Sequence, residues 1–456
     1  RIRLYTENQF AHVRSIAPRN AASSNTIGST TAENVALVLD INNPYLDAAD
    51  RAALTAAGVT SKFILSRTNQ DILGDNPALV ESDTYRSVIG AKGDVSLFSQ
   101  PWSWDVSFTY GQADAKGKFS QLKDIEYALA IDAVRDTSGN IVCRAQLNPS
   151  AYLGNTPPGV VGLERVRVKQ SDGTYKETLI RRVVTQDQIN ACQPLNLIGE
   201  NQMSQASKDY VRADTSFANQ SKQYFGLATI GGTLTELRGG PLGVAFTAEY
   251  RHESINYRPD ALSAIGATRT AALAATEGSI DAWEFSGEAR IPVFGEDFNL
   301  PLFRNLELTP GIRFVRQSGR APNVTLLDGT TLNQSSKGKW DTIYSIAGTW
   351  RPVDMLTVRA NYTRSIRQPS ITELFLGGQP AFVGITDPCA NSQIGAGLDP
   401  ATRRANCRAA VIDAGLASDT ATADAFLNAY VPAGSAINGN FSGSPGLNPE
   451  RGESWT

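Results

Sequence analysis

The sequence predicts an all-β protein: a partial transmembrane antiparallel meander β-barrel of about ten strands, with long extracellular loops that carry short helices. Three observations predict it. Several segments alternate apolar and polar residues over about ten positions, the length that a tilted strand needs to cross a bilayer. Tryptophan and tyrosine stand near the ends of the apolar faces. Short and long connections alternate along the chain, which places the long loops at one end of the sheet.

The alternation is visible in six segments, because a strand directs successive side chains to opposite faces. In order they are Tyr85–Phe98, Trp102–Gly111, Leu242–Ser254, Ala282–Ile291, Trp340–Trp350 and Leu356–Tyr362. In the last segment Leu356, Val358, Ala360 and Tyr362 face one way, while Thr357, Arg359 and Asn361 face the other. One face is therefore suited to lipid and the other to a water-filled space.

A soluble β-sandwich would also alternate, since its outer face is polar and its apolar faces meet in a closed core. The aromatic residues favour the membrane barrel, where girdles of this kind mark the two interfaces. The residues concerned are Trp102, Tyr110, Tyr250, Trp283, Trp340, Trp350 and Tyr362.

The connections are the third argument for a barrel. Short links are predicted at Ser99–Pro101, Glu236–Pro241 and Arg351–Asp354, with a longer one at Pro292–Phe303. Long excursions are predicted at Ala17–Asp83, Ala115–Phe217, Arg258–Ser279, Ser318–Lys337 and Arg367–Gly446. A meandering barrel with short periplasmic turns and long outside loops gives this pattern, whereas a sandwich has no reason to send its long loops to one end.

Two stretches inside the long loops predict short helices. Residues Asn43–Gly58 place Leu46, Ala49, Ala53 and Leu54 at helical spacing and end in glycine. Residues Leu122–Asp136 fit helical and strand spacing alike, and their alanine and acidic residues favour a helix.

The four cysteines, Cys143, Cys192, Cys389 and Cys407, all lie in predicted long loops and lack the C-x-x-C spacing of zinc or redox motifs. Pairing within each loop gives the disulfides Cys143–Cys192 and Cys389–Cys407, which suit an oxidising compartment such as the periplasm. Unpaired buried thiols are the alternative.

Other features exclude several classes of function. A net charge of −3 gives no basic footprint, so nucleic acid is not expected as a partner. The two histidines, His12 and His252, are too few for a His-rich metal site or a catalytic triad. Paired carboxylates at Glu284 and Glu288 stand on a polar strand face, and the glycines near Leu242 suit a tight turn. Nothing in the spacing of Asp387 and Asp399 resembles a calcium loop. We therefore expect no enzyme activity, no catalytic or metal-binding residues and no cofactor.

The chain has no run of eighteen apolar residues and no visible signal peptide. It opens on Arg1 and stops at Thr456, in what looks like a strand, so we expect it to be an internal piece of a longer protein.

Several motifs in the second half of the chain resemble the late barrel of TonB-dependent outer-membrane receptors. They are TRSIRQPSITELF (Thr363–Phe375), DPC at Asp387–Cys389, RANC at Arg404–Cys407 and LNPERGESWT (Leu447–Thr456). The segments DAVRDTSGNIVCRAQLN, CQPLNLIGE and GGPLGVAFTAEYRHES also resemble a long-loop subgroup of these receptors.

The resemblance implies a 22-stranded barrel around an N-terminal plug, of which residues 1–456 would be the middle part, with the plug and the C-terminal strands absent. It implies TonB-energised uptake of a scarce ligand, a siderophore, haem, cobalamin or oligosaccharide, across the outer membrane of a Gram-negative bacterium. The expected partners are outer-membrane lipid, an unknown small ligand, and the TonB complex through the missing plug. The ligand-binding residues are unknown. The alternatives are a passive porin or adhesin barrel, and a secreted glycan-binding β-sandwich.

Overall fold

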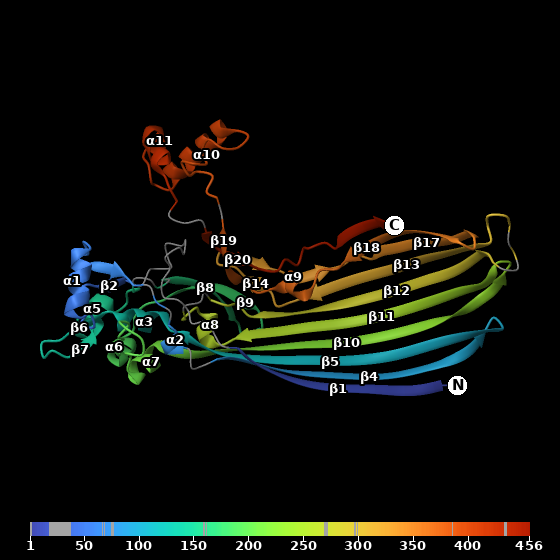
Figure 1. Cartoon of the computed structure of the whole chain (residues 1–456), viewed down its shortest axis with the longest axis horizontal. Coiled ribbons are helices and arrows are strands. Elements are labelled where there is room, and N and C mark those ends of the chain that lie inside the picture. Colours follow the sequence, from blue (N-terminus) through green and yellow to red (C-terminus); the bar gives the residue numbers. More distant parts are fainter. Residues whose placement is uncertain are drawn as a thin grey trace.

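The computed structural model describes residues 2–17, 38–65, 67, 69–73, 77–157, 160, 162–268, 272–295, 298, 300–384, 386–432 and 436–456. Its main feature is one curved antiparallel sheet in which the long strands follow one another in chain order (Figure 1). The first and last strands form the two edges of this sheet, so it is an open part of a barrel wall. This confirms the predicted fold class and the count of about ten long strands.

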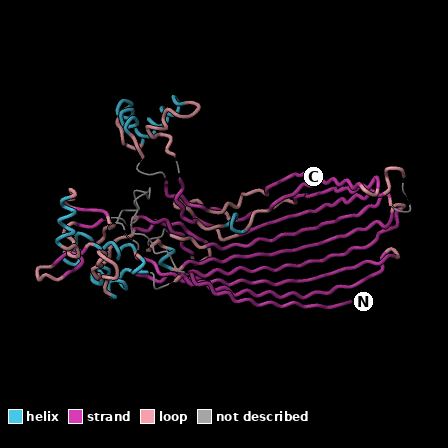
Figure 2. The backbone as a smooth tube through the Cα atoms, in the orientation of Figure 1, coloured by secondary structure: helices cyan, strands magenta, loops and turns pink. Residues whose placement is uncertain are grey.

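The long strands run side by side, each paired with its neighbours in the chain. They are β1 (Ile2–Ala17), β4 (Ala78–Leu97), β5 (Gln100–Leu122), β10 (Arg212–Leu237), β11 (Gly240–Pro259), β12 (Thr276–Phe294), β13 (Asn305–Arg320), β17 (Asp341–Val353), β18 (Leu356–Arg367) and β21 (Glu450–Trp455). The short strand β16 (Ser335–Lys337) also pairs with β13. Tight connections gather at one end of the sheet, and loops with helices gather at the other, as the connection lengths predict (Figure 2).

The outward face of the sheet is apolar over the half nearer the turns, and it carries aromatic rows, as predicted. About halfway along the strands, Tyr110 packs on Tyr224 (5.3 Å between ring centroids) and Tyr250 on Trp283 (4.5 Å). Near the turns, Phe98 contacts Trp102 and Phe303 contacts Trp350. Apolar side chains lie exposed between these rows, including Val106, Phe246, Ile312, Ile346 and Val358. Such a face is stable against lipid rather than against water.

The loop between β5 and β10 has a hydrophobic core of its own. Its helices are α3 (Asp124–Ile131), α4 (Arg144–Leu147), α5 (Pro149–Tyr152), α6 (Gln186–Ala191) and α7 (Gln205–Val211). Its short strands are β6 (Ala133–Arg135), β7 (Ile141–Cys143), β8 (Leu163–Lys169) and β9 (Tyr175–Arg181). Tyr127, Leu129, Ile189 and Val211 are almost fully buried in this core, and α2 (Gln70–Leu73) of the preceding long loop packs on it.

The two helices predicted in the loops are present, with shorter bounds. The first is α1 (Ala48–Ala56), which begins after Asp47, whose side chain accepts a hydrogen bond from the Asp50 amide. In the second stretch, residues Asp124–Ile131 are helical, including the positions that alternate as in a strand, and Ala133–Arg135 form the short strand β6. Residues 18–37, 66, 68 and 74–76 of the first predicted loop lie outside the described residues. The described part holds α1, α2 and the ribbon of β2 (Val38–Asp40) with β3 (Lys62–Ile64), and its last residues belong to β4.

The loop between β18 and β21 contains a separate helical hairpin, drawn in red in Figure 1. Helices α10 (Pro400–Asp413) and α11 (Thr420–Ala429) enclose a small core of Ile394, Cys407, Val411, Ala423 and Leu427. A ribbon of β19 (Gln379–Gly384) with β20 (Ala436–Phe441) leads into it. The other loop elements are α8 (Ala261–Ala264), α9 (Ile371–Phe375), β14 (Val324–Thr325) and β15 (Thr331–Leu332).

Candidate functional site on the inward face of the sheet

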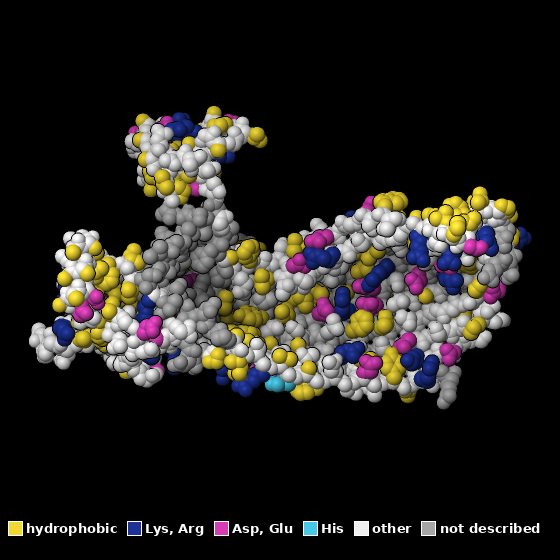
Figure 3. Space-filling view, in the orientation of Figure 1, with side chains coloured by type: hydrophobic (Ala, Val, Ile, Leu, Met, Phe, Trp, Pro, Cys, Tyr) yellow, Lys and Arg dark blue, Asp and Glu magenta, His cyan; other side chains and the backbone are white. Residues whose placement is uncertain are grey.

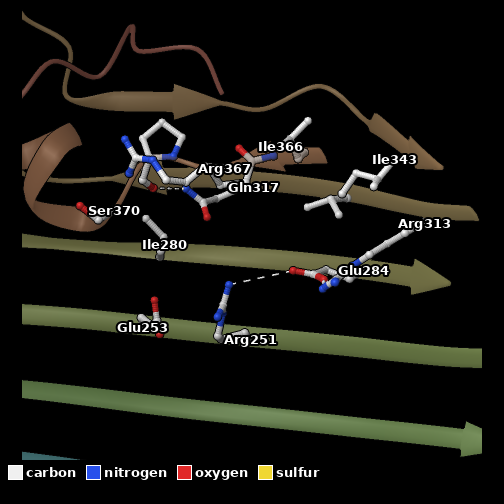
Figure 4. Close-up of a pocket in the computed structure, with 13 residues that line it drawn as sticks. Arg251, Glu253, Ile280, Glu284, Arg313, Gln317, Ile343, Ile366, Arg367 and Ser370 are labelled. Atoms are coloured by element: carbon white, nitrogen blue, oxygen red, sulfur yellow. Dashed lines mark hydrogen bonds and ion pairs between the residues drawn. The ribbon is translucent and has the colours of Figure 1, made fainter. Parts of the chain in front are cut away.

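The inward face is lined by charged side chains that pair across neighbouring strands. Glu284 on β12 lies between two arginines: Arg251 on β11, whose Nη2 is 4.0 Å from Glu284 Oε1, and Arg313 on β13, which pairs with the other carboxylate oxygen (Figure 4). Glu284 is only 8% exposed. A carboxylate with this degree of burial is stable on a sheet face because cations flank it on both sides.

Two further polar groups on this face have partners. Glu253 Oε1 accepts a hydrogen bond from Gln223 Nε2 on β10 (2.7 Å). Gln317 Nε2 on β13 donates to the backbone oxygen of Pro369 (2.6 Å). Two donors remain unpaired, since Arg251 Nε and Gln368 Nε2 are buried with no hydrogen-bond partner among the described residues. A buried donor without a partner is costly, so the face is complementary to something further.

Residues 368–378, called the inner segment here, turn into the concave side of the sheet directly after β18. Helix α9 begins after Ser370 and places Phe375 against Gly278 of β12 and Gly319 of β13. A Cβ atom on either glycine would come within 3 Å of the Phe375 ring, so the glycines form its socket. Gly377 N also donates to Thr276 Oγ1 (3.0 Å). The inner segment is thus fixed to the inward wall of β12 and β13.

Arg367, the last residue of β18, holds the start of the inner segment. Its guanidinium donates two hydrogen bonds to Glu373 of α9 (2.9 and 3.0 Å) and two to Glu450 of β21 (2.6 and 2.9 Å). Glu373 also accepts from the Ser370 amide in a capping box. Together, Arg367 and the Ser370 groups lower the pKa of Glu373 to about 2.

The motifs quoted from the sequence include Arg367, Glu373 and Glu450. The sequence alone predicted no contact among them. The signal was the placement of an arginine and a glutamate around a proline–serine pair, followed by a glutamate at the start of the last strand. The structure brings the three together into one ionic cluster.

The structure pairs Cys143 with Cys192 and Cys389 with Cys407, the two pairings predicted from the sequence. Their Cα atoms are 6.3 and 5.6 Å apart. The first bond lies in the core of the loop between β5 and β10, where both cysteines are buried. The second bond joins Cys407 of α10 to Cys389, which precedes this helix in the same loop.

The remaining candidates from the sequence have structural roles. Asp399 caps α10 by accepting from Thr402 N (3.0 Å), and Asp387 accepts from Tyr430 and from the Cys389 amide. His12 pairs with Asp83 and His252 with Asp281. Within the described residues, no group of three or more metal-ligating side chains gathers. None of the described helices has both the length and the hydropathy of a membrane-spanning helix.

An open antiparallel wall with an apolar outward face, a charged inward face and all long loops at one end defines a membrane β-barrel protein. Residues 33–456 match the family described as TonB dependent receptor-like, beta-barrel, and the chain belongs to this family. Its members are receptors and transporters of the outer membrane. Neither the comparison with curated proteins nor the one with solved structures gave a match.

Proposed function

We propose that the chain is barrel wall from a receptor that takes up a scarce ligand across the outer membrane of a Gram-negative bacterium with energy from TonB. The ligand belongs to the siderophore, haem, cobalamin or oligosaccharide class. The chain has no enzymatic role. In this proposal the apolar face contacts lipid and the inward face surrounds a plug, through which TonB acts.

The observation that supports this proposal best is the inward face itself. Around Glu284 its charges are paired, and yet Arg251 Nε and Gln368 Nε2 are buried without partners among the described residues. A pore lined by water would satisfy such groups without burying them. A folded plug that packs on the wall would supply their acceptors.

Two alternatives differ from this arrangement. A secreted β-sandwich needs two sheets that pack face to face, whereas the long strands here form one continuous sheet. A passive porin needs an open lumen, whereas the inner segment lies against the inward face of β12 and β13.

Uptake measurements test the proposal. Cells with and without the receptor, and with and without TonB, would be given labelled ferrichrome, haemin, cyanocobalamin and maltohexaose in turn. We expect the accumulation of one probe to require both proteins. Accumulation that needs the receptor but persists without TonB, together with ion conductance of the purified protein in planar bilayers, would identify a porin instead.

A further inference from the structure

The inward face changes character between its middle and the loops. Around Glu253 and Glu284 it is charged, but nearer the loops it becomes neutral across β5, β10 and β11. The neutral patch consists of every second residue of β5 from Gly111 to Gln121, every second residue of β10 from Ala213 to Gln223, and Ile255 and Tyr257 of β11. None of these positions, all within the described residues, carries Asp, Glu, Lys or Arg. Figure 3 shows apolar side chains in the hollow near the loop end.

The absence of charge in the neutral patch is a property of one face. At the same level the opposite face of β5 carries Asp114, Lys116 and Lys118, and that of β10 carries Lys222. At this level β5 and β10 therefore direct their charges outward. On the inward face, Arg86 of the neighbouring strand β4 pairs in register with Gly111, and its guanidinium is already bound to Glu7 (3.2 Å). A site for an anionic ligand would direct Lys or Arg inward, since these side chains supply charge-assisted hydrogen bonds.

Three aromatic rings form a row across the neutral patch. Phe217 lies between Phe119 (5.7 Å between ring centroids, 25° between planes) and Tyr257 (5.8 Å, 36°). The Phe217 ring covers Gly117, where a Cβ atom would clash with it. The three side chains remain partly exposed. Next to the row, small residues of β5 leave the wall flat at Gly111, Ala113 and Ala115.

Hydrogen-bonding groups without charge accompany the aromatic row. Asn219 pairs in register with Tyr257, and its amide oxygen is buried with no hydrogen-bond partner among the described residues. An unsatisfied amide beside aromatic rings indicates that a further polar molecule completes this part of the wall. Aromatic faces with a few placed polar groups are typical of small-molecule sites.

We propose that the neutral patch binds the rings of a neutral, hydroxyl-rich ligand, namely the pyranose units of an oligosaccharide. The C–H faces of the sugar rings stack on Phe119, Phe217 and Tyr257, and sugar hydroxyls bond to the Asn219 amide. This inference rests on the proposed function, because it names the ligand class of the same receptor.

The test measures binding to outer membranes that carry the receptor, without energy, at low temperature. The probes are fluorescent maltohexaose, cellohexaose and xylohexaose, with hexagalacturonate as a charged probe of similar size. Phe217→Leu keeps bulk over Gly117 but removes the flat ring, and Asn219→Ala removes the amide. Tyr224→Leu, on the outward face of the same strand β10, is the matched control.

We expect at least one neutral probe to bind more tightly than hexagalacturonate. Phe217→Leu and Asn219→Ala should each weaken that binding by roughly three- to tenfold, with no change in Tyr224→Leu. The proposal is wrong if no neutral probe binds, or if hexagalacturonate binds best. It is also wrong if Phe217→Leu lowers only the unfolding temperature, since the patch would then be a packing surface for the plug.

Energised uptake separates this inference from the proposed function. Neutral-probe binding that depends on Phe217, without TonB-dependent uptake, would support the site and overturn the transport function. TonB-dependent uptake of a charged ligand, unaffected by Phe217→Leu, would support transport and overturn the site.

Discussion

The guanidinium of Arg367 is shared by Glu373, six residues further along the chain, and Glu450, 83 residues further. One side chain thus joins the end of β18, the start of the inner segment and the start of β21. The planar fork of an arginine suits this role, because it donates to two carboxylates in fixed directions, which a lysine cannot do.

Arg367→Lys should therefore loosen the inner segment although the charge is retained. We expect faster proteolytic cleavage within residues 368–378 and a lower unfolding temperature. Arg359→Lys is the control, because Arg359 lies on the same face of β18 and has no ion pair among the described residues. Equal effects of the two substitutions would contradict the role assigned to Arg367.

The interaction of Glu373 should survive mild acid. Its pKa is lowered from 4.5 to about 2 in the folded protein, so its contribution to stability is complete above about pH 4.5 and is lost as the pH falls to about 2. The difference in unfolding temperature between the wild type and Glu373→Gln should be constant from pH 7 to about pH 5. It should then shrink towards pH 2. A difference that disappears already at pH 5 would show that the carboxylate is not held as described.

The two faces of β18 should respond in opposite ways to arginine. Val358 pairs with Trp350 on the outward face, so Val358→Arg places a charge in lipid and should cost roughly 2–4 kcal/mol of unfolding free energy if it lies near the bilayer midplane. Ala360→Arg should behave similarly. Asn361→Arg, on the inward face, should be tolerated. Denaturant titration in phospholipid vesicles measures all three, and equal tolerance on both faces would reverse the assigned orientation.

The glycine socket of Phe375 should not accept a methyl group. In Gly319→Ala the new Cβ would lie 2.8 Å from the Phe375 ring and 3.2 Å from Ile280, so the inner segment must shift. Overpacking of this kind typically costs about 1–3 kcal/mol. Gly226→Ala on β10 is the control, because a Cβ atom at that position would have no described neighbour within 4 Å. Unfolding free energy and proteolysis of residues 368–378 should both separate the two variants.

Removal of the second disulfide should affect the helical hairpin and leave the barrel intact. The bond between Cys389 and Cys407 closes a loop with a sequence separation of 18, for which chain entropy predicts a contribution of about 3 kcal/mol. With both cysteines changed to serine, we expect normal insertion and heat-modifiable migration on gels but weaker ligand capture. Failure of the variant to insert would show that the hairpin takes part in barrel assembly.

The sequence predicted best those parts of the wall whose two faces meet different surroundings. Leu356–Tyr362 alternates plainly because lipid lies on one side and polar groups on the other. The upper half of β10 shows no such pattern, since Lys222 and Asp214 face outward there while Phe217 faces inward. Apolar and polar residues therefore alternate clearly where one face of a strand is apolar and the other polar, and the pattern is lost where both faces carry polar residues.

The site depended on contacts that no local pattern contains. Phe375 meets Gly278 and Gly319 across about a hundred and about sixty residues of chain, and a glycine in a strand carries no mark of what will cover it. The cysteine pairings could be predicted from the sequence because each pair falls within one loop. The core between α3 and α7 could not be predicted, since its helices are too short for periodicity to define them.

The ribbon of β19 with β20 separates the helical hairpin from the wall. Its strands pair residue by residue from Gln379 with Phe441 to Gly384 with Ala436, and the hairpin is closed at its base by the Asn391 amide and the Tyr430 oxygen. Insertions, deletions or whole replacements between these closures should therefore leave the pairing of the ribbon unchanged. The hairpin is a separable module, whose sequence can diverge without changes in the strands of the wall.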